Sequence, residues 1–168
     1  MTLRPGIRVV WRAVPPGVDR RTVSRAVLAE LLPSARFVSR CPSCGGEHGR
    51  VRVEGADAAV SVSYAAGWTV VAMTQKHAAI GVDAVPADVT GLERVLPGGG
   101  DALSWARVEA VLKADGRGLA VDPARVEVSL TEHGWSARVQ EARADNVVWR
   151  GEDVKSPTGI VAAVALGS

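Results

Sequence analysis

Two stretches of the chain carry apolar residues at the spacing of an amphipathic helix. The first covers residues 19–32, where Pro33 ends the pattern and Asp19 is in position to cap the N-terminus. The second covers about 102–115, with Asp101 or Ser104 as the candidate cap. In the first stretch the apolar positions that repeat at helical spacing are Val23, Val27, Leu28 and Leu31. Both patterns predict helices that bury one face.

On the second predicted helix, Trp105, Glu109 and Lys113 follow one another at intervals of four residues. Steps of four advance only about 40° around a helix, so these three side chains share one slowly turning stripe. Val108 and Leu112 fall beside Trp105 and form the buried edge. We therefore expect Glu109 and Lys113 at the border between core and solvent, and Trp105 as a packing anchor.

Elsewhere the pattern changes to the period of two that is typical of β-strands. Residues 58–74 alternate apolar with small polar residues around a glycine-containing turn, which predicts a hairpin. Further strands are predicted at 7–11, 51–55, 78–85, 125–130, 135–140 and 159–166. Residues 40–50 are predicted to be a Cys/Gly-rich loop, and 86–100 a turn-rich segment. Each half of the chain offers one main helix and several strands, so the predicted fold class is α+β.

Composition narrows the class of protein. The 168 residues fit one compact domain, and 47% hydrophobic with 23% charged residues is ordinary for a folded soluble protein. No window approaches the roughly 18–20 apolar residues of a membrane span, and the N-terminus does not resemble a signal peptide. A cytoplasmic protein without a membrane partner is therefore expected.

Charge and cysteine usage point the same way. A net charge of +2 is too small to indicate nonspecific nucleic-acid binding. The two cysteines, Cys41 and Cys44, are too close together for a disulfide framework, which fits a reducing compartment. Lysine occurs only at Lys76, Lys113 and Lys155, the other basic residues being arginine. Lys76 and Lys155 are expected on the solvated surface, and Lys113 stands out by its place on the helical stripe.

Asp83 and Glu109 form a candidate metal site. Asp83 ends an apolar strand, where a lone carboxylate needs a partner or a cation. Taken singly, Asp83 could be a turn residue, and Glu109 with Lys113 could be a surface ion pair. Taken together, the two carboxylates suit Mg²⁺, which prefers oxygen ligands and usually takes one or two carboxylates plus substrate phosphates. Lys113, one turn beyond Glu109, would then face the same phosphates, as phosphoryl transfer requires.

The motifs that contain these residues resemble those of the 4′-phosphopantetheinyl transferases. The strand motif G-[IV]-D-x-E of that family is similar to "GVDAV", and its helix motif W-x-x-K-E-A-x-x-K to "WARVEAVLK". Upstream, "RRTVSRAVLAELL", "CGGEHGRV" and "SVSYAAGW" resemble the first basic helix, the HG-[KR]-P loop and the S-H-S-x-G hairpin. The tail "SPTGIVAAVAL" resembles the closing strand, so the likeness covers residues 19–166 in the right order.

The resemblance implies a reaction and roles for particular residues. Members of the family move 4′-phosphopantetheine from coenzyme A to a serine of an apo acyl or peptidyl carrier protein and release adenosine 3′,5′-bisphosphate. By position, Asp83 and Glu109 look like the Mg²⁺ ligands, with Glu109 also helping to remove the serine proton, and Lys113 like the cation on the phosphates. The positions that match those holding the nucleotide and its 3′-phosphate are Arg21, Thr22, Arg50, Ser63 and Tyr64.

The larger, single-chain members of the family imply the architecture. They fold as two similar αβ subdomains with pseudo-twofold symmetry, and coenzyme A binds in the cleft between them. By this resemblance the subdomains would be roughly residues 1–80 and 81–168 of a single 4′-phosphopantetheinyl transferase domain, 1–168, and the protein would act as a monomer.

Several positions depart from the family pattern. Val85 replaces the second acid of the strand motif, Val108 replaces the first lysine of the helix motif, and Tyr64 replaces a histidine. The segment between residues 86 and 104, which the family uses to meet its carrier, is also short. These changes reduce metal ligation, positive charge or docking surface. They favour an alternative hypothesis, a degenerate member that binds coenzyme A or a carrier protein without efficient transfer.

The cysteine loop allows one further hypothesis. Cys41, Cys44 and His48 have ligand-like spacing for half of a zinc site, and His77 or His133 would have to complete it. A thioredoxin-like redox role is disfavoured, because the C-x-x-C pair lacks the expected βαβ surroundings.

Overall fold

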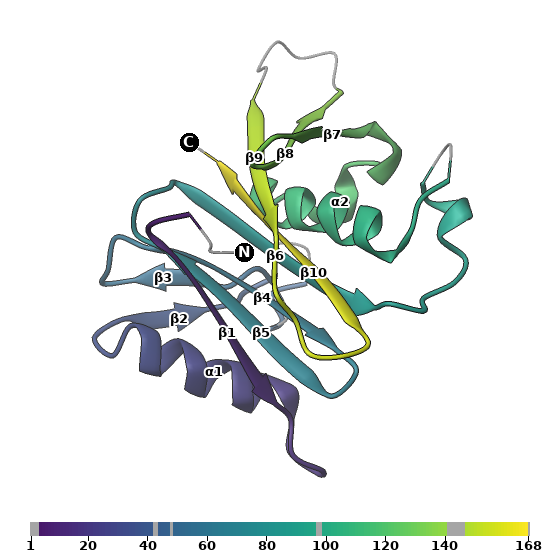
Figure 1. The fold of residues 1–168 in the computed structure, drawn as a ribbon. Helices are drawn as coiled ribbons and strands as arrows, with labels where there is room; N and C mark the ends of the chain where they lie inside the picture. Colours follow the sequence, from purple (N-terminus) through teal and green to yellow (C-terminus); the bar gives the residue numbers. More distant parts are fainter. Residues whose placement is uncertain (1–3, 42–43, 48, 97–98, 141–146, 168) are drawn as a thin grey trace.

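A computed structural model describes residues 4–41, 44–47, 49–96, 99–140 and 147–167. The fold is α+β, as the pattern of the sequence predicts, and its strands form antiparallel sheets (Figure 1). No helix in the described part of the chain is long and apolar enough to cross a membrane.

The first part of the chain builds a three-stranded sheet in the order β1-β5-β4. Its elements are β1 (Ile7–Ala13), α1 (Arg20–Leu31), β4 (Ala59–Ala65) and β5 (Trp68–Thr74). A separate two-stranded ribbon pairs β2 (Arg36–Val38) with β3 (Arg52–Glu54). The hairpin predicted at 58–74 is the β4–β5 pair. The strand β2 was not predicted from the sequence.

The second part builds a five-stranded sheet in the order β6-β10-β9-β8-β7. Its elements are β6 (Ala79–Pro86), α2 (Ala102–Asp115), β7 (Val126–Thr131), β8 (Gly134–Val139), β9 (Val148–Asp153) and β10 (Ile160–Gly167). Short 3-10 turns lie at Leu92–Arg94, Gly118–Ala120 and Pro123–Arg125. The strand β9 was missed in the sequence prediction, whereas the other strands of this sheet and helix α2 begin and end close to the predicted bounds.

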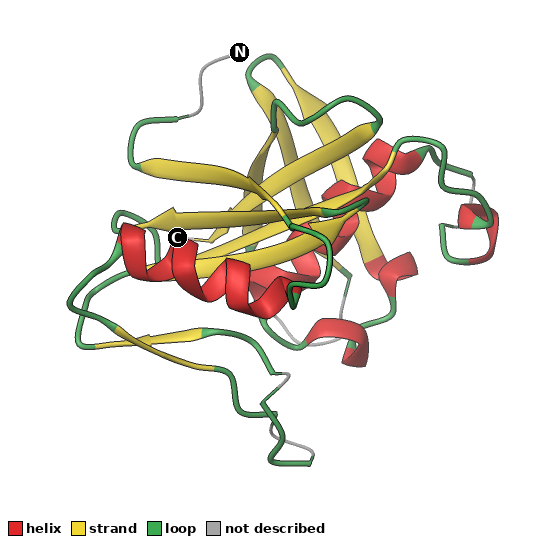
Figure 2. Ribbon diagram, turned by 90° about the horizontal axis from the view of Figure 1, so that it is seen from below, coloured by secondary structure: helices red, strands yellow, loops and turns green. Residues whose placement is uncertain are grey.

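The core consists of apolar layers between these elements. One cluster lies between α1 and β4–β5, one between the two sheets, and one between α2 and the five-stranded sheet. Strands β5, β6 and β10 contribute to two clusters each, because alternate side chains point to opposite faces. Figure 2 shows α1 against its sheet and the β2–β3 ribbon extending away from it.

The helix caps differ in quality. Asp101 caps α2, since its side chain accepts a hydrogen bond from the backbone N–H of Ser104 at 2.8 Å. Asp19 is the N-cap residue of α1, as predicted, although its side chain makes no capping hydrogen bond. Trp105 packs against the core cluster under α2, as expected for a packing anchor.

Candidate functional site

Helix α2 lies directly on strand β6, and Gly81 is the point of contact. A Cβ atom placed on Gly81 would be 2.0 Å from the carbonyl oxygen of Ala110 and 2.5 Å from the backbone nitrogen of Ala114. Only glycine permits this approach. Asp83, two residues further, faces the same side of the strand, and the close packing brings it next to the polar stripe of α2.

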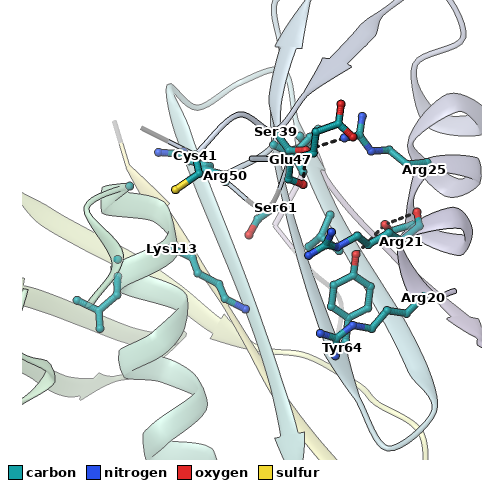
Figure 3. A pocket seen from close by; sticks show the side chains of 18 of the residues that line it. Arg20, Arg21, Arg25, Ser39, Cys41, Glu47, Arg50, Ser61, Tyr64 and Lys113 are labelled. Atoms are coloured by element: carbon teal, nitrogen blue, oxygen red, sulfur yellow. Dashed lines mark hydrogen bonds between the residues drawn. The ribbon is translucent and has the colours of Figure 1, made fainter. Parts of the chain in front are cut away.

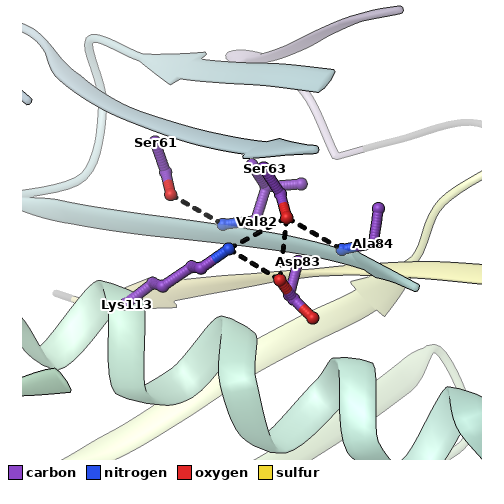
Figure 4. Close-up of polar contacts among 6 residues, drawn as sticks. All are labelled: Ser61, Ser63, Val82, Asp83, Ala84 and Lys113. Carbon is purple, nitrogen blue, oxygen red and sulfur yellow. Dashed lines mark hydrogen bonds and ion pairs between the residues drawn. The ribbon is translucent and has the colours of Figure 1, made fainter. Parts of the chain in front are cut away.

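Asp83 is held by two hydrogen bonds to one of its oxygens (Figure 4). The Lys113 ammonium lies 2.6 Å from Asp83 Oδ1, and the Ser63 hydroxyl donates to the same oxygen at 2.8 Å. Lys113 also donates to Ser63 Oγ at 3.0 Å. The Asp83 side chain is only 8% exposed, whereas Lys113 is 30% exposed. The other oxygen, Oδ2, accepts no hydrogen bond from the described residues and remains available.

Two serines of β4 attach that strand to β6. Ser61 Oγ accepts the N–H of Val82 at 3.0 Å, and Ser63 Oγ accepts the N–H of Ala84 at 3.3 Å. Hydroxyls thus take the place of backbone carbonyls along this edge of β6. Ser63 uses its full hydrogen-bonding capacity, since it donates once, to Asp83, and accepts twice. Its position is therefore fixed from both strands.

Glu109 is a half-buried carboxylate that makes no hydrogen bond or ion pair with any residue the structure describes. Burial raises its pKa above the ordinary glutamate value, the nearby Asp83 charge raises it further, and Lys113 opposes both. The Lys113 ammonium therefore forms an ion pair with Asp83 and acts on the neighbouring Glu109 carboxylate only through its charge. The arrangement favours a second cation near the two acids.

A cavity of about 790 Å³ opens beside Lys113, between the C-terminal end of α2 and the helix α1 (Figure 3). Its basic side chains come from three places in the sequence: Arg20, Arg21 and Arg25 on α1, Arg50 before β3, and Lys113 with Arg117 at the end of α2. Among its described lining residues the single acid is Glu47. The cavity is suited to an anionic ligand.

Tyr64 organises one wall of the cavity. Its hydroxyl is 2.8 Å from Ser24 Oγ on α1, and the Arg20 guanidinium lies over its ring at 4.7 Å from the centroid. A cation over an aromatic face is attracted by the ring quadrupole. Tyr64 therefore acts as a platform that holds Arg20 at the cavity.

Arg50 lies on the opposite wall, against the C-terminal cap of α2. A Cβ on Gly116 would be 2.3 Å from Arg50 Nη1, which shows how closely the guanidinium approaches the helix end. Burial lowers the pKa of Arg50 first, Arg52 lowers it further, and Asp115 opposes them. Arginine still stays charged, because its ordinary pKa is far above neutrality. The negative end of the α2 dipole stabilises this cation.

The structure brings together most of the site residues proposed from sequence. Asp83, Glu109 and Lys113 meet, with Ser63 bonded between β4 and β6 beside them. The cavity next to them is lined by Arg21, Arg50 and Tyr64. Thr22 is not a lining residue of this cavity but of a second one, of about 880 Å³, whose lining also includes Arg21.

Several residues of the site were not identified from the sequence. Arg25 follows Arg21 by four residues, so helical spacing alone would have placed both on one face. Arg20 and Ser24 reach the cavity through their contacts with Tyr64, which no local pattern indicates. The same holds for Ser61, Ser39 and Arg117.

The three residues of the zinc hypothesis are not all among the described residues. Cys41 and Cys44 are described, whereas His48 lies outside the described residues. Within the described ranges no three or more His, Cys, Asp or Glu residues gather in a way that could hold a metal ion.

Comparison with known proteins gave no match, either among protein-family models or among curated protein sequences. The functional argument therefore starts from the geometry and charges of this site.

Proposed function

We propose that this protein is a 4′-phosphopantetheinyl transferase that uses Mg²⁺ to move the phosphopantetheine of coenzyme A onto a serine of an apo acyl or peptidyl carrier protein. The observation that carries the proposal is the meeting of Asp83, Glu109 and Lys113 beside an arginine-lined cavity. Adjacent carboxylates suit a hard divalent cation, and surrounding arginines suit phosphates. Phosphoryl transfer needs both, because positioning and charge neutralisation provide most of its catalysis.

The donor set fits Mg²⁺. Asp83 Oδ2 carries no hydrogen bond from the described residues, and burial first, then the Asp83 charge, raises the pKa of Glu109, so positive charge is favoured beside both carboxylates. Mg²⁺ commonly keeps several waters and takes only one or two protein carboxylates, so the apolar side chain of Val85 does not exclude it. Bound there, the ion would neutralise charge on the diphosphate of coenzyme A.

The cavity fits the nucleotide end of coenzyme A. Its volume of about 790 Å³ is within the range of small-molecule sites. Arg20, Arg21 and Arg50 supply planar guanidinium groups, which bind phosphate oxygens with paired hydrogen bonds. The adenosine 3′-phosphate would take these arginines, and the diphosphate would extend toward Lys113.

The residues of the chain divide the work of the transfer. The carrier serine oxygen forms a bond to the β-phosphorus of coenzyme A while the bond from that phosphorus to the bridging oxygen breaks. The serine proton passes to Glu109, the half-buried carboxylate of α2, directly or through a metal-bound water. Lys113 donates hydrogen bonds to the phosphate oxygens of the departing adenosine 3′,5′-bisphosphate.

The topology supports the two-subdomain architecture that this function implies. The two sheets share a pattern of connection. In the first sheet β5, the last strand in the chain, lies between β1 and β4, and helix α1 follows β1. In the second sheet β10, again the last strand, lies between β6 and β9, and helix α2 follows β6. We propose that the halves, roughly 1–80 and 81–168, are related by a pseudo-twofold axis with the substrate cleft between them. The enzyme would act as a monomer in the cytoplasm.

The test is transfer itself. The protein is incubated with coenzyme A, Mg²⁺ and a panel of apo carrier proteins, and the carriers are weighed by intact mass spectrometry. We expect a Mg²⁺-dependent gain of one phosphopantetheine, and its loss in Asp83→Ala and Glu109→Ala with the fold retained by circular dichroism. Unchanged transfer in both variants would defeat the assignment of the two carboxylates.

The alternative, a binder without efficient transfer, is favoured by one observation. Val108 of α2 is 4% exposed and packs in the core between this helix and its sheet. The position where the family has a lysine therefore supplies no second cation beside Lys113. Coenzyme A binding in calorimetry, together with no mass gain on any carrier, would establish this second function in place of the first.

A further inference from the structure

Lys113 meets two different demands for positive charge. Its ammonium forms an ion pair with Asp83 at 2.6 Å, and within the described chain it is the ion-pair partner of that carboxylate. The same side chain lines the anion cavity, into which it extends from α2 (Figure 3). A single ammonium therefore lies between a buried acid and the space where a phosphate would bind.

The surroundings allow the ammonium to move. Lysine is a compact charge on a flexible four-carbon stem, so a small rotation redirects it without moving the helix. Lys113 is 30% exposed on the cavity side, whereas Asp83 is 8% exposed and is also fixed by the Ser63 hydroxyl at 2.8 Å. If the ammonium leaves, Asp83 stays in place with a buried negative charge next to Glu109, which is costly unless another cation replaces it.

We propose that Lys113 couples the anion site to the metal site: an anion in the cavity draws the ammonium away from Asp83 and leaves the carboxylate for a divalent cation. The inference rests on the function proposed above. Coupling between two sites is reciprocal, so the metal must strengthen anion binding by the same factor. Each ligand binds weakly alone and tightly with the other. Until the nucleotide binds, the Asp83–Lys113 ion pair therefore keeps the site free of metal.

The experiment measures binding, independently of transfer. Mn²⁺ is titrated by electron paramagnetic resonance into the wild-type chain, with and without adenosine 3′,5′-bisphosphate, and free Mn²⁺ is corrected for chelation by the nucleotide. We expect the nucleotide to tighten Mn²⁺ binding at least about fivefold, the lower end of typical allosteric coupling. Lys113→Met should bind Mn²⁺ at least about fivefold more tightly than wild type without nucleotide, and the nucleotide should then tighten Mn²⁺ binding by a smaller factor than in wild type.

Two further variants complete the design. Lys155→Met removes the same charge from an exposed lysine in the loop between β9 and β10, so it controls for net charge and should behave as wild type. Asp83→Asn should remove Mn²⁺ binding. The wild-type titration alone can overturn the proposal, so it does not depend on how well Lys113→Met folds.

The outcomes separate the inference from the proposed function. Equal Mn²⁺ affinity of the wild type with and without nucleotide would refute the coupling. Equal Mn²⁺ affinity of wild type and Lys113→Met without nucleotide would also refute it. In either case, loss of Mn²⁺ binding in Asp83→Asn would still show that Asp83 belongs to the metal site. No Mn²⁺ binding to any variant, with nucleotide present, would refute both the coupling and the metal-dependent transferase.

Discussion

Gly81→Ala should disable the site without touching a polar residue. The added Cβ would be 2.0 Å from the Ala110 carbonyl oxygen, which must move to at least 3.4 Å for ordinary contact. The obstacle is helix backbone, so α2 as a whole has to retreat from β6 by more than about 1 Å, and Glu109 and Lys113 move with it. A misplacement of about 1 Å can cost about 100-fold in rate. The overpacking should cost about 1–3 kcal/mol of unfolding free energy.

A second glycine provides the control. A Cβ on Gly167, at the far end of β10, would be 2.6 Å from the Trp149 ring, so Gly167→Ala also overpacks the core, but its clash is with a side chain of β9 and not with the backbone of α2. For a chain of this length, 1–3 kcal/mol corresponds to a fall in Tm of about 2–12 °C. Melting curves and the carrier mass assay are run on both variants. Transfer that falls equally in both, or stays intact in Gly81→Ala, would refute the argument that this contact positions the site.

Three further predictions follow from the contacts of the acids. Ser63→Ala should weaken Mn²⁺ binding and slow transfer because it frees Asp83, whereas Ser61→Ala should cost about 1 kcal/mol in chemical denaturation and leave Mn²⁺ binding unchanged. Glu109→Gln should abolish transfer yet raise Tm at pH 8. Since the folded-state pKa of Glu109 is raised, its ionised form is the destabilising one, so the gain should vanish as pH falls below the ordinary glutamate pKa. Val85→Glu, on the same face of β6 as Asp83, should leave transfer equal or higher in the mass assay; a clear loss would count against a third acid here.

The missed strands show where local pattern stops being informative. β2 is three residues long and is defined by its pairing with β3 across the cysteine loop. β9 carries Arg150, Glu152 and Asp153, which look like loop residues. Glu152 is nevertheless 3% exposed because Arg4 pairs with it at 2.6 Å, and Asp153 pairs with Arg107 of α2. These partners are far away in sequence, so no window around β9 contains the reason for its charges.

The candidate site was predictable to a similar extent. Helical spacing placed Glu109 and Lys113 on one stripe. The prediction that Asp83 ends its strand is wrong, because β6 continues to Pro86 and Asp83 pairs with Ala163 inside it. The direct contact between Lys113 and Asp83 was not predictable, because it depends on how closely α2 approaches β6 at Gly81. The arginines of α1 reach the same cavity only through the arrangement of the sheets.

The junction between the sheets explains why the site lies where it does. Along the facing edges of β4 and β6, the serines Ser61 and Ser63 bond to the N–H groups of β6. Their hydroxyls share one face because they are two residues apart on a strand. One of the two therefore also reaches Asp83, so the bond that joins the sheets also orients the acid. Most of the cavity's arginines come from the first part of the chain, on α1 and before β3, whereas Lys113 and Arg117 come from the second. Neither part alone contains a complete site, and a ligand bound across it should stabilise the junction as well as the cavity.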